Sequence, residues 1–380
     1  MAIETLVDLA TQWIDISLLA LLACTAITVV RMRSLWAAVM LTGIYSFLGA
    51  SWMLILDAPD VAFTEAAVGA GISTVLMLST LALTGTTMKE RTKSPLLPLT
   101  VVTVTGAALV YGTADMPHYG DPTAPVHQHL MPEFMADTVP SIHVVDSNHS
   151  VANSHGMVSD ATDSNNHHTK TGVGVGNVVT AVLASYRGYD TLGETVVIFT
   201  AAIGVLLMLR GNQRVRNHVP ERTSDSTLPS YPLSPMRHRA ISRVVSKLVI
   251  PYILLFGLYV QFHGDYGPGG GFQAGVIFAS AFILYGLVFG LPAARTVTPP
   301  RLIEILIALG VLIYAGTGVV SMLLGGNFLD YSVLEHQLWP GFLPHGQHLG
   351  ILLVELGVGI TVAAVMITIF FAIAGRERVQ

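Results

Sequence analysis

Long apolar runs alternate with short polar breaks along most of the chain. The runs hold about 17–25 residues each, which is enough for a helix to cross a hydrocarbon core of roughly 30 Å. The pattern therefore predicts an all-α, polytopic membrane protein. Its nine transmembrane helices are expected at residues 16–32, 35–56, 61–84, 95–113, 193–210, 244–263, 271–290, 302–325 and 347–371.

Composition and charge agree with that pattern. Of the 380 residues 52% are hydrophobic and 11% are charged, whereas soluble domains carry roughly a quarter charged residues. With the N-terminus outside and the C-terminus cytoplasmic, all of the 19 basic residues except Lys170 and Arg187 fall on the cytoplasmic side. We therefore expect a multi-pass protein of the cytoplasmic (inner) membrane, lying in the lipid bilayer. The net charge of −5 argues against a nucleic-acid partner.

Two polar breaks divide the chain. Residues 1–212 form a predicted five-helix membrane domain, residues 213–240 a basic cytoplasmic linker rich in Pro and Ser, and residues 241–380 a four-helix membrane domain. An exterior loop at 114–178 holds eight of the 14 His residues and few large apolar ones. A polar loop without a core is the simplest interpretation. Metal binding and pH sensing are alternatives, but no spacing of a known zinc motif is present.

Carboxylates inside apolar spans are costly, and so they indicate a function or a partner. Glu65, Glu194 and Glu355 are the candidates for an ion pathway. For Glu194 two other interpretations remain: a favourable anion at a helix N-terminus, or an interfacial partner of Arg187.

Further titratable groups lie near the predicted outer surface. His348 is seven residues before Glu355 and on the same helix face, while His263 and Asp265 stand at the mouth of the turn at 262–275. They complete the predicted set of pathway residues. The alternative for His348 is that it merely lies at the level of the lipid headgroups.

Glycine clusters occur at two places. Gly69 and Gly71 follow Glu65, where small residues allow close helix packing or a local π-bulge. In the turn at 262–275 the glycines let the next helix begin against a neighbouring backbone; a dinucleotide loop is excluded because no strand precedes it. The structural residues predicted in this turn are Pro268, Gly269, Gly270 and Gly271.

Four stretches resemble known membrane proteins. Two of them, PDVAFTEAAVGAGIST and YRGYDTLGETVVIFTAAIGVLLML, resemble the MbhD/MbhE-type domain found at the C-terminal end of the large MnhA-type component of Mrp (Mnh) multisubunit Na⁺/H⁺ antiporters. The other two, PYILLFGLYVQFHGDYGPGGGFQAGVIFASAFILYGLVFG and LLVELGVGITVAAVMITIF, are similar to the MnhB family of the same antiporters. The resemblance implies a complex related to the membrane arm of respiratory complex I, with Glu65 and Glu194 at acids thought to line the ion path.

The expected function follows from this resemblance. The chain is expected to be a subunit of a cation/proton antiporter that lines part of the ion pathway and holds other Mrp/Mnh-type membrane subunits. Na⁺ and H⁺ would be transported, with no cofactor, no bound metal and no enzymatic activity. The long antiporter-like portion does not precede the first unit, and no Lys lies deep in a span, which favours an accessory half-channel. The alternatives are a membrane-arm subunit of an energy-converting hydrogenase or complex I-related oxidoreductase, and a purely structural bridge.

Overall fold

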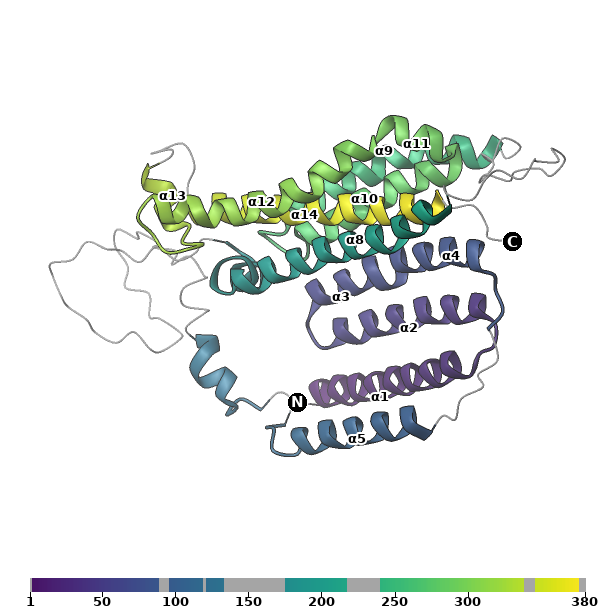
Figure 1. The fold of residues 1–380 in the computed structure, drawn as a ribbon. Helices are drawn as coiled ribbons and strands as arrows, with labels where there is room; N and C mark the ends of the chain where they lie inside the picture. Colours follow the sequence, from purple (N-terminus) through teal and green to yellow (C-terminus); the bar gives the residue numbers. More distant parts are fainter. Residues whose placement is uncertain are drawn as a thin grey trace, which may run out of the picture.

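The chain folds as a set of long helices that lie side by side with their axes roughly aligned, and the chain runs back and forth along them (Figure 1). The computed structural model describes residues 2–88, 96–118, 121–132, 175–216, 240–337 and 346–375. Within these ranges nine helices are long and apolar enough to cross a membrane. The predicted number of spans is therefore confirmed.

The N-terminal helices include one span that is broken by a π-helical segment. In that segment the Ser73 N–H donates to the carbonyl of Val68, five residues earlier, instead of the usual four. The possibility of a π-bulge beside Glu65 is thus realised. The elements are α1 (Ala2–Arg31), α2 (Leu35–Ile55), α3 (Pro59–Glu65), η1 (Ala66–Ile72), α4 (Ser73–Thr84) and α5 (Leu96–Thr113).

The fifth span begins earlier than the sequence pattern predicts. Its helix α8 covers Gly188–Arg216 and follows the short segments α7 (Val178–Thr180) and η3 (Ala181–Tyr186). Val175 and Asn177, which fall at the end of the predicted exterior loop, are buried. Asn177 lies against the segment between α9 and α10, because its N–H donates to the Asp265 carbonyl and its side chain donates to the Gly264 and Gly267 carbonyls. The same side chain caps α7 by accepting a hydrogen bond from the Val179 N–H. Elsewhere in that loop the described residues include the π-helical turn η2 (Val126–Leu130).

The C-terminal helices make the most compact part of the molecule, with α14 at its centre. Gly275 on α10 meets the backbone of Gly359 on α14, and Gly310 on α12 meets that of Gly357. Such glycines let helices approach closely in a membrane. The elements here are α9 (Ala240–His263), α10 (Gly271–Phe289), α11 (Leu291–Val297), α12 (Pro300–Leu323), α13 (Ser332–Gln337) and α14 (Gly346–Ala374).

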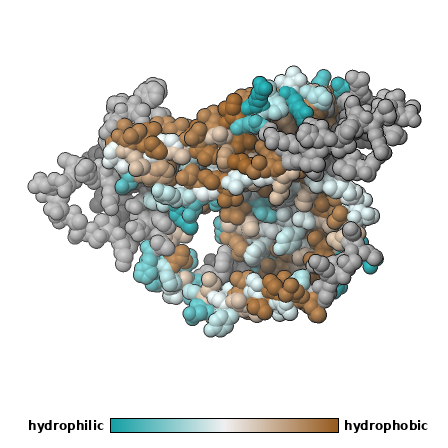
Figure 2. All heavy atoms as spheres, in the orientation of Figure 1, coloured by the Kyte–Doolittle hydropathy of each residue, from teal (hydrophilic) through white to brown (hydrophobic). Residues whose placement is uncertain are grey.

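The surface matches a protein surrounded by lipid or by other membrane helices. Apolar residues run along the upper helices, and hydrophilic residues gather around α9 and α11 (Figure 2). Many large apolar side chains are exposed, including Leu97 and Val102 on α5. In water such a surface would cause aggregation, and so the distribution supports a membrane-spanning fold.

Candidate functional site

A turn rich in glycine, residues 264–270, joins α9 to α10 and lies directly against α14. Within it the Gly270 N–H donates to the Val260 carbonyl at 3.1 Å, and Gly270 has a φ of +118°, a conformation that favours glycine. A Cβ on Gly271 would overlap the backbone carbonyl of Glu355. The glycines therefore permit the start of α10 to press against the α14 backbone, in the manner expected for this motif. We refer to residues 264–270 as the glycine turn.

The carboxylate of Glu355 lies over this glycine turn. Its Oε2 is 3.2 Å from the position that a Cβ would take on Gly264, and its Oε1 is 3.3 Å from the corresponding position on Gly270. Oε2 is buried and has no hydrogen-bond partner in the described part of the chain. A buried carboxylate without a donor is costly unless a proton, water or cation satisfies it.

Asp265 and His348 lie in close contact beside Glu355. His348 Nδ1 is 3.1 Å from Asp265 Oδ2, and Asp265 is only 3% exposed. Burial raises the pKa of the Asp265 carboxyl above its usual range, and the nearby His348 opposes that shift. Asp265 Oδ1 is the second buried carboxylate oxygen that the described residues leave without a partner. His348 keeps a side-chain exposure of 30% and so connects the pair to the surface.

Asn177 fastens the glycine turn to two other parts of the chain. Its Nδ2 donates to the carbonyls of Gly264 and Gly267 at 3.2 and 3.0 Å, and lies 3.3 Å from Asp60 Oδ1. Thr180 adds a hydrogen bond to the Gly264 carbonyl at 2.7 Å. Because Asn177 is almost fully buried, these bonds hold α3, α7 and the turn in one arrangement.

Gln273 makes a further connection, between α10 and α3. Its Nε2 donates to Thr64 Oγ1 at 2.6 Å, and Thr64 donates in turn to the backbone carbonyl of Asp60 at 2.9 Å. Gln273 is 7% exposed. We refer to Asp60, Thr64, Asn177, Asp265, Gln273, His348 and Glu355 as the junction cluster.

The remaining predicted pathway residues lie outside this cluster. Glu65 is partly buried at the end of α3, and its Oε1 is 2.7 Å from where a Cβ of Gly69 would lie. Glu194 is exposed on α8. His263 is stacked on Tyr259, with 4.9 Å between ring centroids, and lines the glycine turn next to Gly267.

Two of the alternatives can now be distinguished by geometry. Arg187 pairs with Asp190 at 2.5 Å, and so the structure does not support Arg187 as the partner of Glu194.

The two glycines after Glu65 also differ. A Cβ on Gly69 would overlap Ser46, whereas one on Gly71 would make only an ordinary contact at 3.6 Å. Pro268 is exposed, while Gly269 and Gly270 are buried.

Sequence reasoning missed the polar partners of the acids. The available signal for these partners was a polar residue in or beside an apolar run, as at Asp60, Asn177 and Gln273. Asp15 was missed in the same way; it lies within α1 and accepts a hydrogen bond from Trp52 on α2 at 2.5 Å. A search of the described residues finds no group of three His, Cys, Asp or Glu that fits a metal centre.

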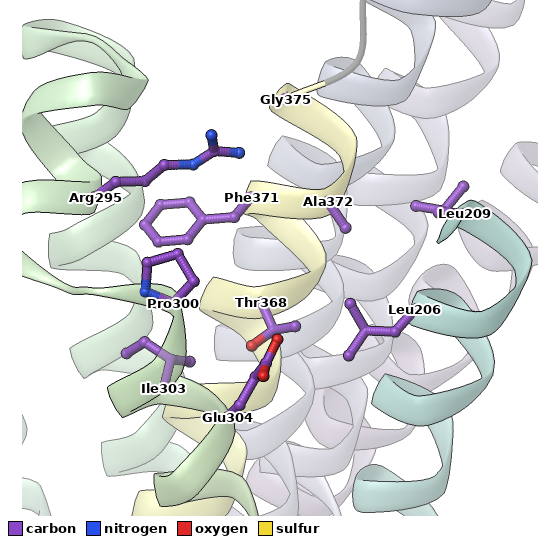
Figure 3. A pocket seen from close by; sticks show the side chains of 10 residues that line it. All are labelled: Leu206, Leu209, Arg295, Pro300, Ile303, Glu304, Thr368, Phe371, Ala372 and Gly375. Carbon is purple, nitrogen blue, oxygen red and sulfur yellow. The ribbon is translucent and has the colours of Figure 1, made fainter. Parts of the chain in front are cut away.

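A cavity of about 180 Å³ lies at the opposite end of α14. Figure 3 shows Glu304 and Thr368 pointing toward each other between α12 and α14, with Arg295 at the rim beside Phe371. None of the predicted pathway residues lines this cavity. It is therefore separate from the junction cluster.

Three parts of the chain match known families. Residues 241–368 match MnhB, the domain related to the MnhB subunit of the Na⁺/H⁺ antiporter. Residues 20–86 match the MbhD family and residues 151–224 the MbhE family, both of them subunits of MBH. Each match contributes to the junction cluster. Asp60 and Thr64 come from the MbhD match, Asn177 from the MbhE match, and the other members from the MnhB match.

Individual relatives agree with these matches. The putative antiporter subunit mnhB2 of Staphylococcus haemolyticus strain JCSC1435 is 38% identical over 137 residues, which are 36% of this chain and 95% of that protein. The protein of the same name from Staphylococcus aureus strain MRSA252 is 37% identical over 135 residues, 36% of this chain and 94% of the relative.

A solved structure matches almost the whole fold. In the structure of the Mrp complex from Dietzia sp. DQ12-45-1b, one chain aligns with a TM-score of 0.66 and 25% identity over 95% of this chain. This chain spans about a third of that one, 34% of its length. Because the C-terminal helices cover nearly all of the mnhB2 proteins, the chain belongs to the MnhB family of Mrp antiporter subunits, and it carries MbhD and MbhE domains ahead of its MnhB domain.

Proposed function

We propose that this chain is a subunit of a multisubunit cation/proton antiporter, in which it lines part of the ion route and holds the antiporter-like subunits. The observation that carries the proposal is the pair of buried carboxylate oxygens without partners, Asp265 Oδ1 and Glu355 Oε2. A carboxylate that served only to join helices would be satisfied by donors from those helices. These two oxygens are instead free to take a proton or a cation.

The position of the cluster supports an entrance to such a route. His348 connects Asp265 to the surface, and Gln273 connects the cluster to α3, whose last residue is Glu65. With the N-terminus outside, as the distribution of Lys and Arg favours, the glycine turn faces the outside of the cytoplasmic membrane. The cluster is then the outer end of the route, and Glu65 is a later point on it.

The lysine and the acids in the spans favour an accessory role for this chain over complete cation/proton exchange by this chain alone. Within the described spans, lysine occurs at Lys247, near the start of α9. Its Nζ lies 5.9 Å from the ring centroid of Phe289. A lysine so close to a helix end can extend its charge to the interface. The chain therefore supplies acids to the route, and partner subunits supply the rest. We place Na⁺ and H⁺ as the transported ions by analogy with the MnhB family.

The matches to the MbhD and MbhE families favour a second candidate, a membrane-arm subunit of an energy-converting hydrogenase or a related oxidoreductase. Mass spectrometry of proteins that purify with the tagged chain separates the two. Antiporter-like membrane subunits alone support the first candidate, whereas hydrogenase or iron–sulfur subunits in stoichiometric amounts support the second.

The ion route itself is tested by replacing Glu355 with Gln. The amide keeps the shape but cannot take up a proton, so Na⁺-dependent proton movement in membrane vesicles should fall on the order of 100-fold, the size of effect that proton-transfer groups have. Thr361→Val is the matched control, because the Thr361 hydroxyl on the same helix bonds only to its own backbone, at the Gly357 carbonyl. Exchange at the wild-type rate by an intact Glu355→Gln complex would remove the cluster from the route.

A further inference from the structure

The space over Gly270 is bordered by two oxygen atoms from different helices. Gln273 Oε1 on α10 is 3.5 Å, and Glu355 Oε1 on α14 is 3.3 Å, from the point that a Cβ of Gly270 would occupy. Any side chain there would fill the gap between them. Gly270 therefore keeps open a small space that oxygen atoms face.

Thr64 determines which end of the Gln273 amide faces this space. The Thr64 hydroxyl has one proton, which it donates to the Asp60 carbonyl at 2.9 Å. It can then only accept from Gln273, and it does so from Nε2 at 2.6 Å. The amide nitrogen is thereby fixed on the α3 side, and the carbonyl oxygen is turned toward Gly270 and Glu355.

Both groups at the space are thus acceptors. In the part of the chain that the structure describes, Gln273 Oε1 and the Glu355 carboxylate receive no hydrogen bond. Gln273 is nevertheless 93% buried, since 7% of it is exposed. Two acceptors that border one space and receive no donor suit a positive or hydrogen-donating ligand between them.

The charge and chemistry of the site define the ligand. Carboxylate and amide oxygens are hard ligands that suit s-block cations. Glu355 brings one negative charge, and the Gln273 amide is neutral, so one positive charge balances the pair. The N-terminus of α10, which begins at Gly271, lies beside this carboxylate.

We propose that the space over Gly270 is a binding site for one small monovalent cation, Na⁺, held by Glu355 Oε1 and Gln273 Oε1, with Thr64 orienting the amide. Its place on a transport route rests on the function proposed above, whereas binding itself does not. Gln273 is then a ligand that determines affinity for Na⁺, and Thr64 is a positioning residue.

Binding is measured without transport by protection of Glu355 from a carbodiimide. Dicyclohexylcarbodiimide modifies buried carboxylic acids, and mass spectrometry of the intact, detergent-solubilised complex reports the adduct on Glu355. Na⁺ should suppress the adduct, while choline at the same ionic strength should not. In Gln273→Met, which has similar length but no oxygen, the Na⁺ concentration for half protection should rise about tenfold, as when a group that supports an ion site is lost.

Three controls make the result decisive. Gln347→Met removes another α14-region amide, one that accepts from Ser185 at 3.1 Å outside the site, and should leave protection unchanged. Thr64→Val should weaken protection, and Thr64→Ser should restore it. An adduct that Na⁺ does not suppress, absence of any adduct on Glu355, or equal protection in wild type and Gln273→Met would each overturn the site. If protection is found but the complex exchanges no ions, the site stands and the proposed function fails.

Discussion

The N-terminal half of the molecule, α1 to α8 (2–216), and its C-terminal half, α9 to α14 (240–374), differ in how completely their helices are buried. We call the first the looser half and the second the compact half. Of the most apolar 18 residues of α14, 61% are buried, and of those of α10, 50% are buried. None of the corresponding residues of α1 and α5 is buried. The C-terminal helices thus pack mainly on one another, and α1 and α5 face outward along their length. The difference teaches that the C-terminal helices form the most buried part of the molecule, with a core that η1 and α8 complete, and that α1 and α5 present apolar faces suited to lipid or to other membrane helices.

Glu355 and Glu65, two of the glutamates predicted to line the ion pathway, differ in the same way. Glu355 lies in the compact half, beside the Gln273 amide, the N-terminus of α10 and the contact between His348 and Asp265. Glu65 lies in the looser half, partly buried at a π-helical segment. We infer that Glu355 works in a preformed site and that Glu65 depends on groups from other subunits.

The strongest test of this contrast is Glu65→Gln. We expect an assembled complex whose Na⁺-dependent proton movement is reduced on the order of 100-fold, because an amide cannot release a proton. Glu65→Asp should keep part of the activity. A purely structural role predicts that Gln is harmless or stabilising, since a neutral side chain is cheaper in lipid. Wild-type exchange by Glu65→Gln would leave Glu355 as the pathway acid in this chain.

Gly270→Leu tests whether the compact half depends on its glycine turn. The φ of +118° and the closeness of Glu355 leave no room for a side chain, so the variant should lose on the order of 1–3 kcal/mol through strain and overpacking. The amount of assembled complex, measured by native gel electrophoresis, should fall. Gly71→Leu is the matched control in the looser half, where space is open. Normal assembly of Gly270→Leu would contradict this expectation.

Asn177→Ala should have a smaller effect on the connection between the halves. The change leaves the carbonyls of Gly264 and Gly267 without the Asn177 donor, at a cost of about 1–3 kcal/mol. We expect a lower melting temperature of the complex, and Asn177→Asp should restore the cap of α7 but not the bonds to the turn. An unchanged melting temperature for both variants would show that the halves do not need this connection.

The smallest expected effect is a shift in the pH profile of His348→Gln. His348 lowers the pKa of Asp265, in opposition to burial, so its removal raises that pKa further. Asp265 then ionises only at higher pH, and the fall of exchange on the acid side should move upward on the order of one pH unit. Initial rates in vesicles between pH 5 and 8, about the range in which His titrates, measure the shift. A shift to lower pH would contradict the expectation that His348 lowers the pKa of Asp265.

Local pattern was sufficient for the helices but not for the partners of the acids. Span lengths predicted nine membrane helices, and glycine density pointed to both the π-helical segment and the turn beside α14. The roles of Asn177 and Gln273 depend on residues more than 80 positions away, and no local spacing reveals such contacts. Arg187 shows the same limit at short range, because Asp190 lies one helical turn away and Glu194 two.

The bonds of Asn177 also constrain how the protein is made. Its side chain reaches back 117 residues to Asp60 and forward 87 and 90 residues to the carbonyls of Gly264 and Gly267. Since synthesis proceeds from the N-terminus, the junction cluster cannot close until the hairpin of α9 and α10 has entered the membrane. A chain that stops short of that point holds Asp60 and Glu65 but lacks Asp265 and Glu355. Truncated products therefore lack both of the buried carboxylate oxygens, Asp265 Oδ1 and Glu355 Oε2, on which the proposed ion route depends.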